Sequence, residues 1–282
     1  MFIPLTPLRL LQRAAEVHPD RPAIIDGPRS FTYQEMSAQV TRHAQALRGR
    51  GLRRGDRVAC LAPNCAEAFV AHFAAPLAGG VLVTLNTRLS GTEIAHIVGH
   101  SGAEFLLGDA ALLEPALDGL RAVSTVLEIV TLPSDSGQTI RLAGTTAYAE
   151  LLAVGTDERL EFTVADGNDP ISVNCTSGTT GSPKRVVYIH RGAYLASLGT
   201  VIHQGFADGS RHLWTLPMFH CNGWCTTWAL TAVAGTHMCL RAVRAEDIWR
   251  LIDEEDVTHM PACRRSWRCF ASRRRRIRSG SR

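Results

Sequence analysis

Segments typical of β-strands and of helices alternate along most of this 282-residue chain. β-prone runs at 57–61, 81–85 and 104–107 are separated by segments at 64–78 and 91–101, in which apolar residues recur at helical spacing. Strands that alternate with helices of this length form βαβ units, whose strands run parallel. We therefore predict an α/β fold of layered, largely parallel sheets with flanking helices.

Two capping-box signatures indicate where helices begin. Thr32 is followed three residues later by Glu35, and Ser90 is followed in the same way by Glu93. In this motif the hydroxyl and the carboxylate accept hydrogen bonds from backbone N–H groups that the first helical turn leaves without partners. The motifs predict helices that begin directly after each hydroxyl residue, and helical spacing predicts a third helix near 110–121.

The most apolar stretch of the chain covers residues 59–85 and is interrupted by Pro63, Pro76 and the pair Gly79-Gly80. A membrane-spanning helix needs about 20 predominantly apolar residues without such breaks. The stretch therefore predicts a buried helix followed by a buried strand, and no transmembrane segment. The first residues of the chain lack a basic leader before their apolar run, so they do not read as a signal peptide.

The composition is that of an ordinary soluble globular protein, with 45% hydrophobic and 20% charged residues. Eight cysteines are too sparse for a disulfide scaffold in a chain of this length, and none of them forms a CxxC pair. Reduced, mostly buried thiols are typical of cytosolic proteins. We therefore expect a cytoplasmic location.

The positive charge of the chain is confined to its last residues. Residues 261–282 contain nine arginines and no acid, so residues 1–260 carry a net charge of −5 although the whole chain carries +4. We predict an incomplete domain over 1–260 and an arginine-rich tail over 261–282 that is disordered or read out of frame. A genuine anion-binding tail is the alternative, and no specific nucleic-acid partner is expected for the body of the chain.

A segment rich in glycine and hydroxyl residues predicts a phosphate-binding loop. It lies between two strand-like runs, 171–175 and 186–189, and ends in Lys184, the single lysine of the chain. Glycines let the backbone approach a phosphate closely, hydroxyls donate hydrogen bonds, and an ammonium adds a full charge. A flexible surface linker is the alternative interpretation, whereas the glycine spacing excludes a Walker P-loop. The predicted phosphate contacts are Thr176, Ser177, Gly178, Thr179, Thr180, Gly181 and Lys184.

The run from 171 to 185 (ISVNCTSGTTGSPKR) resembles the signature phosphate loop of the adenylate-forming superfamily, which includes acyl-CoA synthetases. Residues 31–36 (FTYQEM) and 77–86 (LAGGVLVTLN) look like two of its earlier motifs. Residues 216–224 (LPMFHCNGW) resemble the acyl-pocket motif of its fatty-acid and medium-chain acyl-CoA synthetase branch. The similarity covers about residues 8–260 and implies part of the N-terminal domain of such an enzyme.

The resemblance implies an enzyme that activates a fatty or other small carboxylic acid with ATP and passes the acyl group to coenzyme A. It implies that the loop at 176–184 holds the β- and γ-phosphates and that Mg²⁺ assists. Ordinary packing at a strand-to-helix junction is the alternative for the aromatic and histidine side chains of the acyl motif. A metal at His220, Cys221 and Cys225 would have too few ligands at unsuitable spacing. The acyl-pocket residues implied are His220, Asn222, Gly223 and Trp224.

This sequence departs from the family pattern in two respects. Arg185 stands where the family usually has glycine, and we expect its side chain to crowd the nucleotide. The later family motifs are missing, namely the acidic magnesium ligand, the adenine and ribose contacts, and the C-terminal domain with the adenylation lysine. We therefore expect a truncated acyl-CoA synthetase that does not turn over alone. The alternative is a non-catalytic fragment with residual nucleotide or acyl binding, or with a role in protein interaction.

Overall fold

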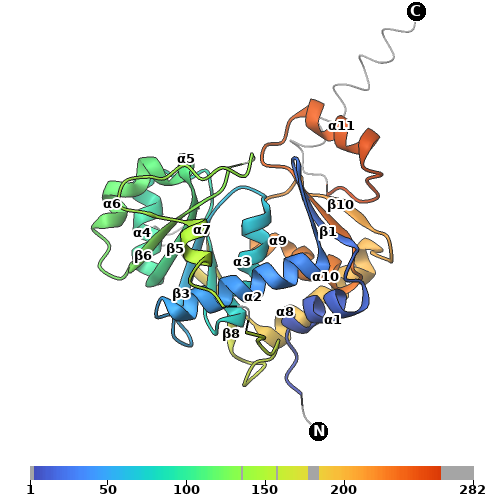
Figure 1. Ribbon diagram of the computed structural model, residues 1–282, viewed down its shortest axis with the longest axis horizontal. Coiled ribbons are helices and arrows are strands. Elements are labelled where there is room, and N and C mark those ends of the chain that lie inside the picture. The colour runs from blue at the N-terminus through green and yellow to red at the C-terminus, as the bar shows by residue number, and fades with distance from the viewer. Residues whose placement is uncertain (1–2, 135, 157, 177–183, 262–282) are drawn as a thin grey trace, which may run out of the picture.

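The computed structural model describes residues 3–134, 136–156, 158–176 and 184–261. Its larger sheet has seven strands, and every neighbouring pair is parallel except β8 and β9, which form an antiparallel hairpin. The predicted largely parallel sheet is therefore confirmed (Figure 1). In spatial order the strands are β7 (Thr146–Ala147), β6 (Glu128–Leu132), β5 (Ala103–Asp109), β3 (Arg57–Leu61), β4 (Val81–Thr84), β8 (Pro170–Thr176) and β9 (Lys184–Ile189).

A second sheet of four strands joins the beginning of the chain to its later part. β1 pairs in parallel with β11, which lies more than 200 residues further along the chain, and antiparallel with β2. β10 completes the sheet as a parallel neighbour of β11. The order in space is β10 (Arg211–Leu213), β11 (Thr236–Cys239), β1 (Pro22–Asp26) and β2 (Arg29–Thr32).

Helices and sheets stack as alternating layers (Figure 1). One group of helices packs into the main core between the two sheets: α1 (Leu8–Val17), α2 (Tyr33–Gly49), α3 (Ala66–Leu77), α7 (Tyr148–Leu152), α8 (His190–Gln204) and α10 (Thr226–Ala232). The short helix α9 (Cys221–Trp224) precedes α10. A second group covers the outer face of the larger sheet: α4 (Gly91–Ser101), α5 (Ala110–Leu113), the 3₁₀ turn η1 (Glu114–Ala116) and α6 (Leu117–Arg121). Helix α11 (Ala245–Glu254) covers the outer face of the smaller sheet.

Alternation of side chains along β3 explains the two cores of the larger sheet. Val58 and Cys60 face the main core with α2 and α3, whereas Ala59 and Leu61 face the core formed with α4 and α6. A strand that is covered on both faces reads as a continuous apolar run, as β3 does. Helix α3 lies between the two sheets, so all twelve of its residues are buried. The predicted buried helix followed by a strand within residues 59–85 is confirmed.

The predicted helix starts are confirmed, and one predicted helix is broken. Thr32 and Ser90 form complete capping boxes with Glu35 and Glu93 at the first turns of α2 and α4. The segment expected to be one helix near 110–121 consists instead of α5, η1 and α6. Pro115 lies in η1 and has no backbone N–H to donate, which interrupts the helical hydrogen-bond ladder.

Within the described residues, no helix combines the length and apolar character needed to cross a bilayer.

A network of ion pairs ties the two sheets together. Arg29, at the start of β2, donates to both oxygens of Glu67 on α3, at 2.6 and 3.2 Å, and to Asp26 at the end of β1. Arg241, which follows β11, lies 3.8 Å from Asp26 and donates to Asp109, at the end of β5, at 3.1 Å. Burial alone would lower the pKa of Arg29, but the hydrogen bond and charge of Glu67, together with Asp26, raise it above its usual value.

Removing one charge from this network is expected to destabilise the fold strongly. Glu67→Gln leaves the buried guanidinium of Arg29 with one carboxylate fewer, and such losses typically cost about 3 kcal/mol or more. Glu150→Gln is the matched control, because Glu150 pairs with Arg141 at the surface, where a pair contributes about 0–1 kcal/mol. The measurement is the free energy of unfolding in urea. Equal effects of the two substitutions would contradict a structural role for the network.

Several histidines are buried without charge in the core. Burial lowers the pKa of His43 to about 3 and that of His72 to about 4. Burial and the charge of His259 lower the pKa of His212 to about 3. His212 is 4% exposed, packs edge-on against Phe206 and Trp214, and neither of its ring nitrogens has a hydrogen-bond partner among the described residues.

These histidines predict a loss of stability in mild acid. Below pH 6.5 these histidines are protonated in the unfolded chain but stay neutral in the folded chain. Each of them therefore lowers the free energy of unfolding by about 1.4 kcal/mol for every unit by which the pH falls, until the pH reaches its folded-state pKa. His212→Phe removes one of these sites without losing a hydrogen bond. We expect it to reduce the slope of stability against pH between 6 and 4 by about that amount. His203→Gln, at the exposed end of α8, is the control, and identical slopes in both variants would refute the assignment.

Candidate functional site

The order of strands in the larger sheet indicates where a ligand site belongs. The chain runs from β3 to its neighbour β4 and then crosses back to β5 on the other side of β3. The two connections lie on opposite faces, because α3 belongs to the main core and α4 to the outer one. In such sheets ligands bind at the carboxyl ends of the strands near this reversal. The candidate site is therefore the region beyond the carboxyl ends of β3, β4 and β8.

Asn64 anchors a loop over these strand ends. It follows β3, is 6% exposed, and donates through Nδ2 to the carbonyl oxygens of Trp214 and Leu216, both at 2.9 Å. Its Oδ1 accepts a hydrogen bond from the backbone N–H of Met218 at 2.7 Å. The first residues of the predicted acyl motif are thus held by backbone contacts to one buried side chain. Sequence reasoning missed Asn64, although a polar residue within three positions of the end of a buried parallel strand is a usable signal.

A second contact fixes the same loop to β4 and β8. The hydroxyl of Thr84, the last residue of β4, donates to the carbonyl oxygen of Phe219 at 2.9 Å and lies 3.3 Å from Oδ1 of Asn174 on β8. Thr84 and Asn174 are 5% and 7% exposed. The acyl motif therefore lies against the strand that leads into the predicted phosphate loop.

The predicted phosphate loop connects β8 to β9. Thr176 is the last residue of β8 and pairs across the hairpin with Lys184, the first residue of β9. Asn174 pairs with Val186, so Lys184 lies on the same face of the hairpin as Asn174. The structure thus brings the lysine to the face on which the acyl motif packs. The other predicted contacts fall outside the described residues: Ser177, Gly178, Thr179, Thr180 and Gly181.

Arg185 lies on the opposite face of the hairpin from Lys184. It pairs with Cys175, whose side chain packs into the outer core. Its guanidinium donates to the carbonyl oxygen of His100, near the carboxyl end of α4, at 3.3 Å. Burial raises the pKa of Cys175, and the nearby charge of Arg185 opposes that rise. The departure at 185 therefore places a cation against the end of a helix, where positive charge is favourable.

The last residues of the acyl motif form a strained turn. Cys221, Gly223 and Trp224 have φ of +48°, +57° and +57°, and Cys225 follows at +59°. A Cβ on Gly223 would lie 2.9 Å from the ring of Trp214, so glycine is required for space as well as for conformation. Residues other than glycine rarely adopt a positive φ, and backbone strain of this kind clusters at functional sites.

The predicted acyl-pocket residues occupy different environments. Gly223 is buried, whereas His220 is exposed and Trp224 is 62% exposed. The hydroxyl of Thr200 on α8 donates to the carbonyl oxygen of Trp224 at 3.4 Å. Asn222 lies in α9, and its side chain is outside what the structure describes. The turn thus presents His220 and Trp224 at the surface, and Gly223 packs beneath them.

A cavity of about 350 Å³ opens at the carboxyl ends of β3 and β4. Asn64 and the early acyl-motif residues Leu216 and Phe219 form one side of it. Arg88, Arg241 and Arg244 also line it. Arg241 is paired with Asp26 and Asp109, so Arg88 and Arg244 supply the positive charge suited to an anionic ligand. The cavity and the predicted acyl motif therefore share a wall.

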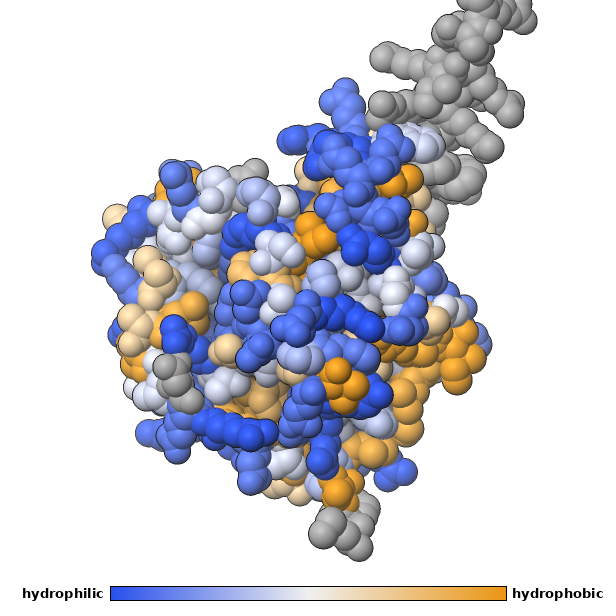
Figure 2. Space-filling view, turned by 45° about the vertical axis from the view of Figure 1, so that its right-hand side comes forward, coloured by the Kyte–Doolittle hydropathy of each residue, from blue (hydrophilic) through white to orange (hydrophobic). Residues whose placement is uncertain are grey.

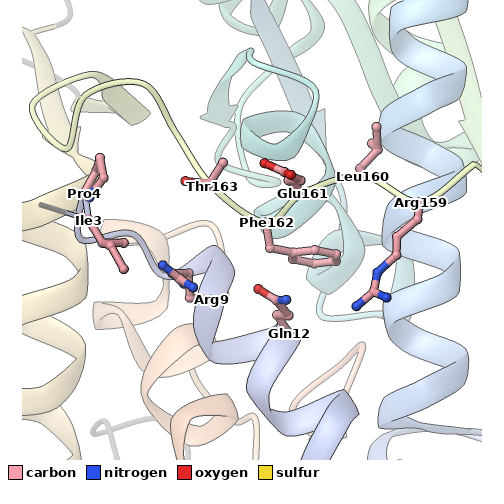
Figure 3. A pocket seen from close by; sticks show the side chains of 9 residues that line it. All are labelled: Ile3, Pro4, Arg9, Gln12, Arg159, Leu160, Glu161, Phe162 and Thr163. Carbon is pink, nitrogen blue, oxygen red and sulfur yellow. The ribbon is translucent and has the colours of Figure 1, made fainter. Parts of the chain in front are cut away.

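A larger cavity of about 780 Å³ lies elsewhere, between the N-terminal segment with α1 and residues 159–163. Figure 3 shows its nine lining side chains, among them Arg9, Phe162 and Arg159. It contains none of the residues that the sequence predicted for phosphate or acyl binding. Size alone would favour it, but strand order favours the smaller cavity, because ligands bind at the carboxyl ends of parallel strands.

The described residues form no metal site from protein side chains alone. Among them, no group of three or more His, Cys, Asp or Glu side chains could hold a metal ion. The carboxylates nearest to the strand reversal, Asp26, Glu67 and Asp109, are ion-paired with Arg29 and Arg241. No step of the chemistry is therefore assigned to a metal held by these residues.

Comparison with known proteins identifies the family. A model of the family described as AMP-binding enzyme matches residues 11–279. Acetate–CoA ligase CCL3 from Humulus lupulus is 38% identical over 273 residues, which are 93% of this chain and 48% of the ligase. Trans-cinnamate:CoA ligase from Petunia hybrida is 38% identical over 92% of this chain and 48% of its own. A fatty acyl CoA synthetase structure from Mycobacterium tuberculosis superposes with a TM-score of 0.81 at 27% identity, covering 94% of this chain and 50% of its own.

The chain belongs to the AMP-binding enzyme family. Its relatives in that family are CoA ligases, and it spans about half of their length. The resemblance drawn from the phosphate loop and the acyl motif is therefore confirmed, as is the layered α/β fold.

Loss of the Asn64 side chain is expected to loosen the acyl motif. Asn64→Ala leaves buried backbone groups of Trp214, Leu216 and Met218 without partners, so we expect a loss of about 2–3 kcal/mol in the free energy of unfolding. Asn168→Ala is the control, because Asn168 is exposed and bonds only to nearby Asp166. Hydrogen exchange at the Met218 amide reports the local effect. Unchanged protection of that amide in Asn64→Ala would show that the loop is held by other contacts.

Proposed function

We propose that this chain is the part of an acyl-CoA synthetase that binds the ATP phosphates and the carboxylic acid substrate. The observation that supports this proposal is the placement of Lys184 and the acyl motif on one face of the β8–β9 hairpin, at the carboxyl ends of parallel strands. Membership of the AMP-binding family supports ATP as the nucleotide.

The proposed reaction has two steps. A carboxylate oxygen of the acid attacks the α-phosphorus of ATP, the bond from that phosphorus to the bridging oxygen of the β-phosphate breaks, and pyrophosphate leaves. The thiolate sulfur of coenzyme A then attacks the acyl carbon, and AMP leaves with the electron pair of the broken C–O bond. The residues of this chain contribute positioning and neutralisation of charge, which dominate catalysis of phosphoryl chemistry.

Each part of the site has a role in this proposal. The ammonium of Lys184 stabilises the phosphates by offsetting part of their negative charge. Asn64 and Thr84 hold the loop that carries the acyl motif in a fixed position beside the nucleotide. The arginine-lined cavity attracts the anionic substrates.

The substrate proposed is a carboxylic acid, without a stated chain length. The relatives reported above are named for acetate and trans-cinnamate, which share a carboxylate but differ in size and shape. Both acids present a carboxylate that is taken out of water on binding. The size of acid that fits depends on the pocket, which is formed by side chains from several elements.

This part of the enzyme is proposed not to complete turnover by itself. Among the described residues no cluster of three or more His, Cys, Asp or Glu side chains could hold a metal ion, and the chain spans 48% of the hop ligase. Removal of one well-placed electrostatic group typically lowers a rate about a hundredfold to a thousandfold. Binding of nucleotide is therefore the activity that tests the proposal directly.

Lys184→Ala is expected to weaken ATP binding by about tenfold to a hundredfold, because a charged hydrogen bond to phosphate contributes about 1.5–3 kcal/mol. Arg185→Ala is the matched control. It removes a cation one residue away, whose side chain lies on the opposite face against α4. Calorimetry with ATP measures both affinities.

Equal weakening by the two substitutions would indicate a general effect of charge and would refute the specific role of Lys184. Tighter binding by Arg185→Ala would show that the arginine crowds the nucleotide after all.

A further inference from the structure

Helix α4 carries two histidines on its solvent side. Ile94, Ile97 and Val98 face inward and pack into the outer core of the larger sheet. His96 and His100 are both exposed. Residues four positions apart in a helix are neighbours on one face, so the two imidazoles lie side by side, one turn apart.

The two rings form a close pair. Their centroids are 6.1 Å apart, and their planes are inclined by only 10°. Polar side chains cover most of the face of the molecule that Figure 2 shows, so exposure by itself does not mark a site. The pair is distinguished instead by two nitrogen donors of the same kind, held at a fixed spacing on one helix.

Both ends of α4 are fixed by local contacts. Ser90 and Glu93 form a complete capping box at its first turn, and Gly102 ends the helix with φ of +66°. The inward face is buried in the outer core. A binding site on such a rigid element needs little ordering of the backbone, so only the two imidazole side chains have to adjust to a ligand.

The separation of the rings is compatible with one shared metal ion. A Zn–N bond is about 2.0–2.1 Å long, so the centre of a coordinating imidazole lies about 3.2 Å from the ion. Two rings that share an ion therefore have centroids at most about 6.4 Å apart, or about 5.2 Å apart at a tetrahedral angle. The observed 6.1 Å lies within this limit. Because the rings are nearly parallel, at least one must rotate to direct its nitrogen at the ion, and this torsion of histidine is a soft one.

The donors define the class of ion. Imidazole nitrogen suits Zn²⁺, Cu²⁺ and Ni²⁺, whereas Mg²⁺ takes oxygen ligands. Two histidines at this spacing on one helix are also the zinc ligands of the HExxH metalloproteases. Among the described residues no cluster of three or more ligands exists, so water must complete the coordination sphere here. A site with two protein ligands is weaker than a structural zinc site with four.

The surroundings of the pair contribute charge of both signs. His100 lies in the last turn of α4, where the helix dipole favours a cation. Arg185 donates to the carbonyl oxygen of His100 at 3.3 Å, and its charge opposes a second cation nearby. The arginine contacts the backbone of His100, so this hydrogen bond does not use either ring nitrogen. We therefore expect a site of modest affinity.

We propose that His96 and His100 form a two-histidine site for a divalent transition-metal ion such as Ni²⁺, Cu²⁺ or Zn²⁺, with water as the remaining ligand. The bound ion joins two successive turns of α4 and stabilises the helix that covers the outer face of the larger sheet. The site is separate from the proposed ligase reaction, and its donors discriminate against the Mg²⁺ that accompanies ATP.

The test is calorimetric titration of the untagged 282-residue chain with NiCl₂ alone at about pH 8, where imidazole is available as a ligand. We expect saturable binding of one ion at this site, and no binding of MgCl₂ to it. His96→Gln and His100→Gln should each weaken Ni²⁺ binding at least about tenfold, because the chelate needs both rings. His203→Gln is the matched control and should leave the affinity unchanged, because His203 is exposed on α8 with Gly199 and Ala207 four residues away.

Stability in urea gives a second readout. An ion that binds only the folded helix raises the midpoint of unfolding, so Ni²⁺ should raise it in the parent chain and in His203→Gln but not in His100→Gln. Unchanged affinity in His96→Gln or His100→Gln would assign the ion to other groups and overturn the proposal. An equal loss in His203→Gln, or the absence of saturable binding by the parent chain, would overturn it as well.

Discussion

The ion pairs among Asp26, Arg29, Glu67, Arg241 and Asp109 connect segments that are far apart in the sequence and belong to both sheets. Buried charges of this kind are costly unless each finds a partner, so the two sheets must meet in an arrangement that keeps these side chains paired. Its members lie at the carboxyl ends of β1 and β5 and at the start of α3. This arrangement keeps the strand ends together and gives the arginine-lined cavity one of its walls.

Above these strand ends, the candidate site depends on a few polar contacts to backbone. Asn64 and Thr84 hold the loop of the acyl motif, and the β8–β9 hairpin carries Lys184 to the same face. Side chains alternate between the two faces of the hairpin, so Arg185 lies on the face opposite Lys184, where it contacts the end of α4. Arg185 is therefore accommodated by contacts on the outer side of the larger sheet.

The same hairpin leads directly from the site into helix α8. One strand supplies the lysine at its first position and an apolar edge at its third and fourth positions.

Local patterns determined most elements of the fold. Alternation predicted the parallel sheet, the capping boxes at Thr32 and Ser90 began α2 and α4, and the glycine-rich loop with Lys184 and residues 216–224 carried the family resemblance. The pairing of β1 with β11, the partners of Asn64 and the contact of Arg185 with the end of α4 were decided by tertiary structure. The reason is physical: propensities and caps act within a few residues of sequence, whereas ion pairs, buried amides and sheet neighbours depend on which distant segments the packed core brings together.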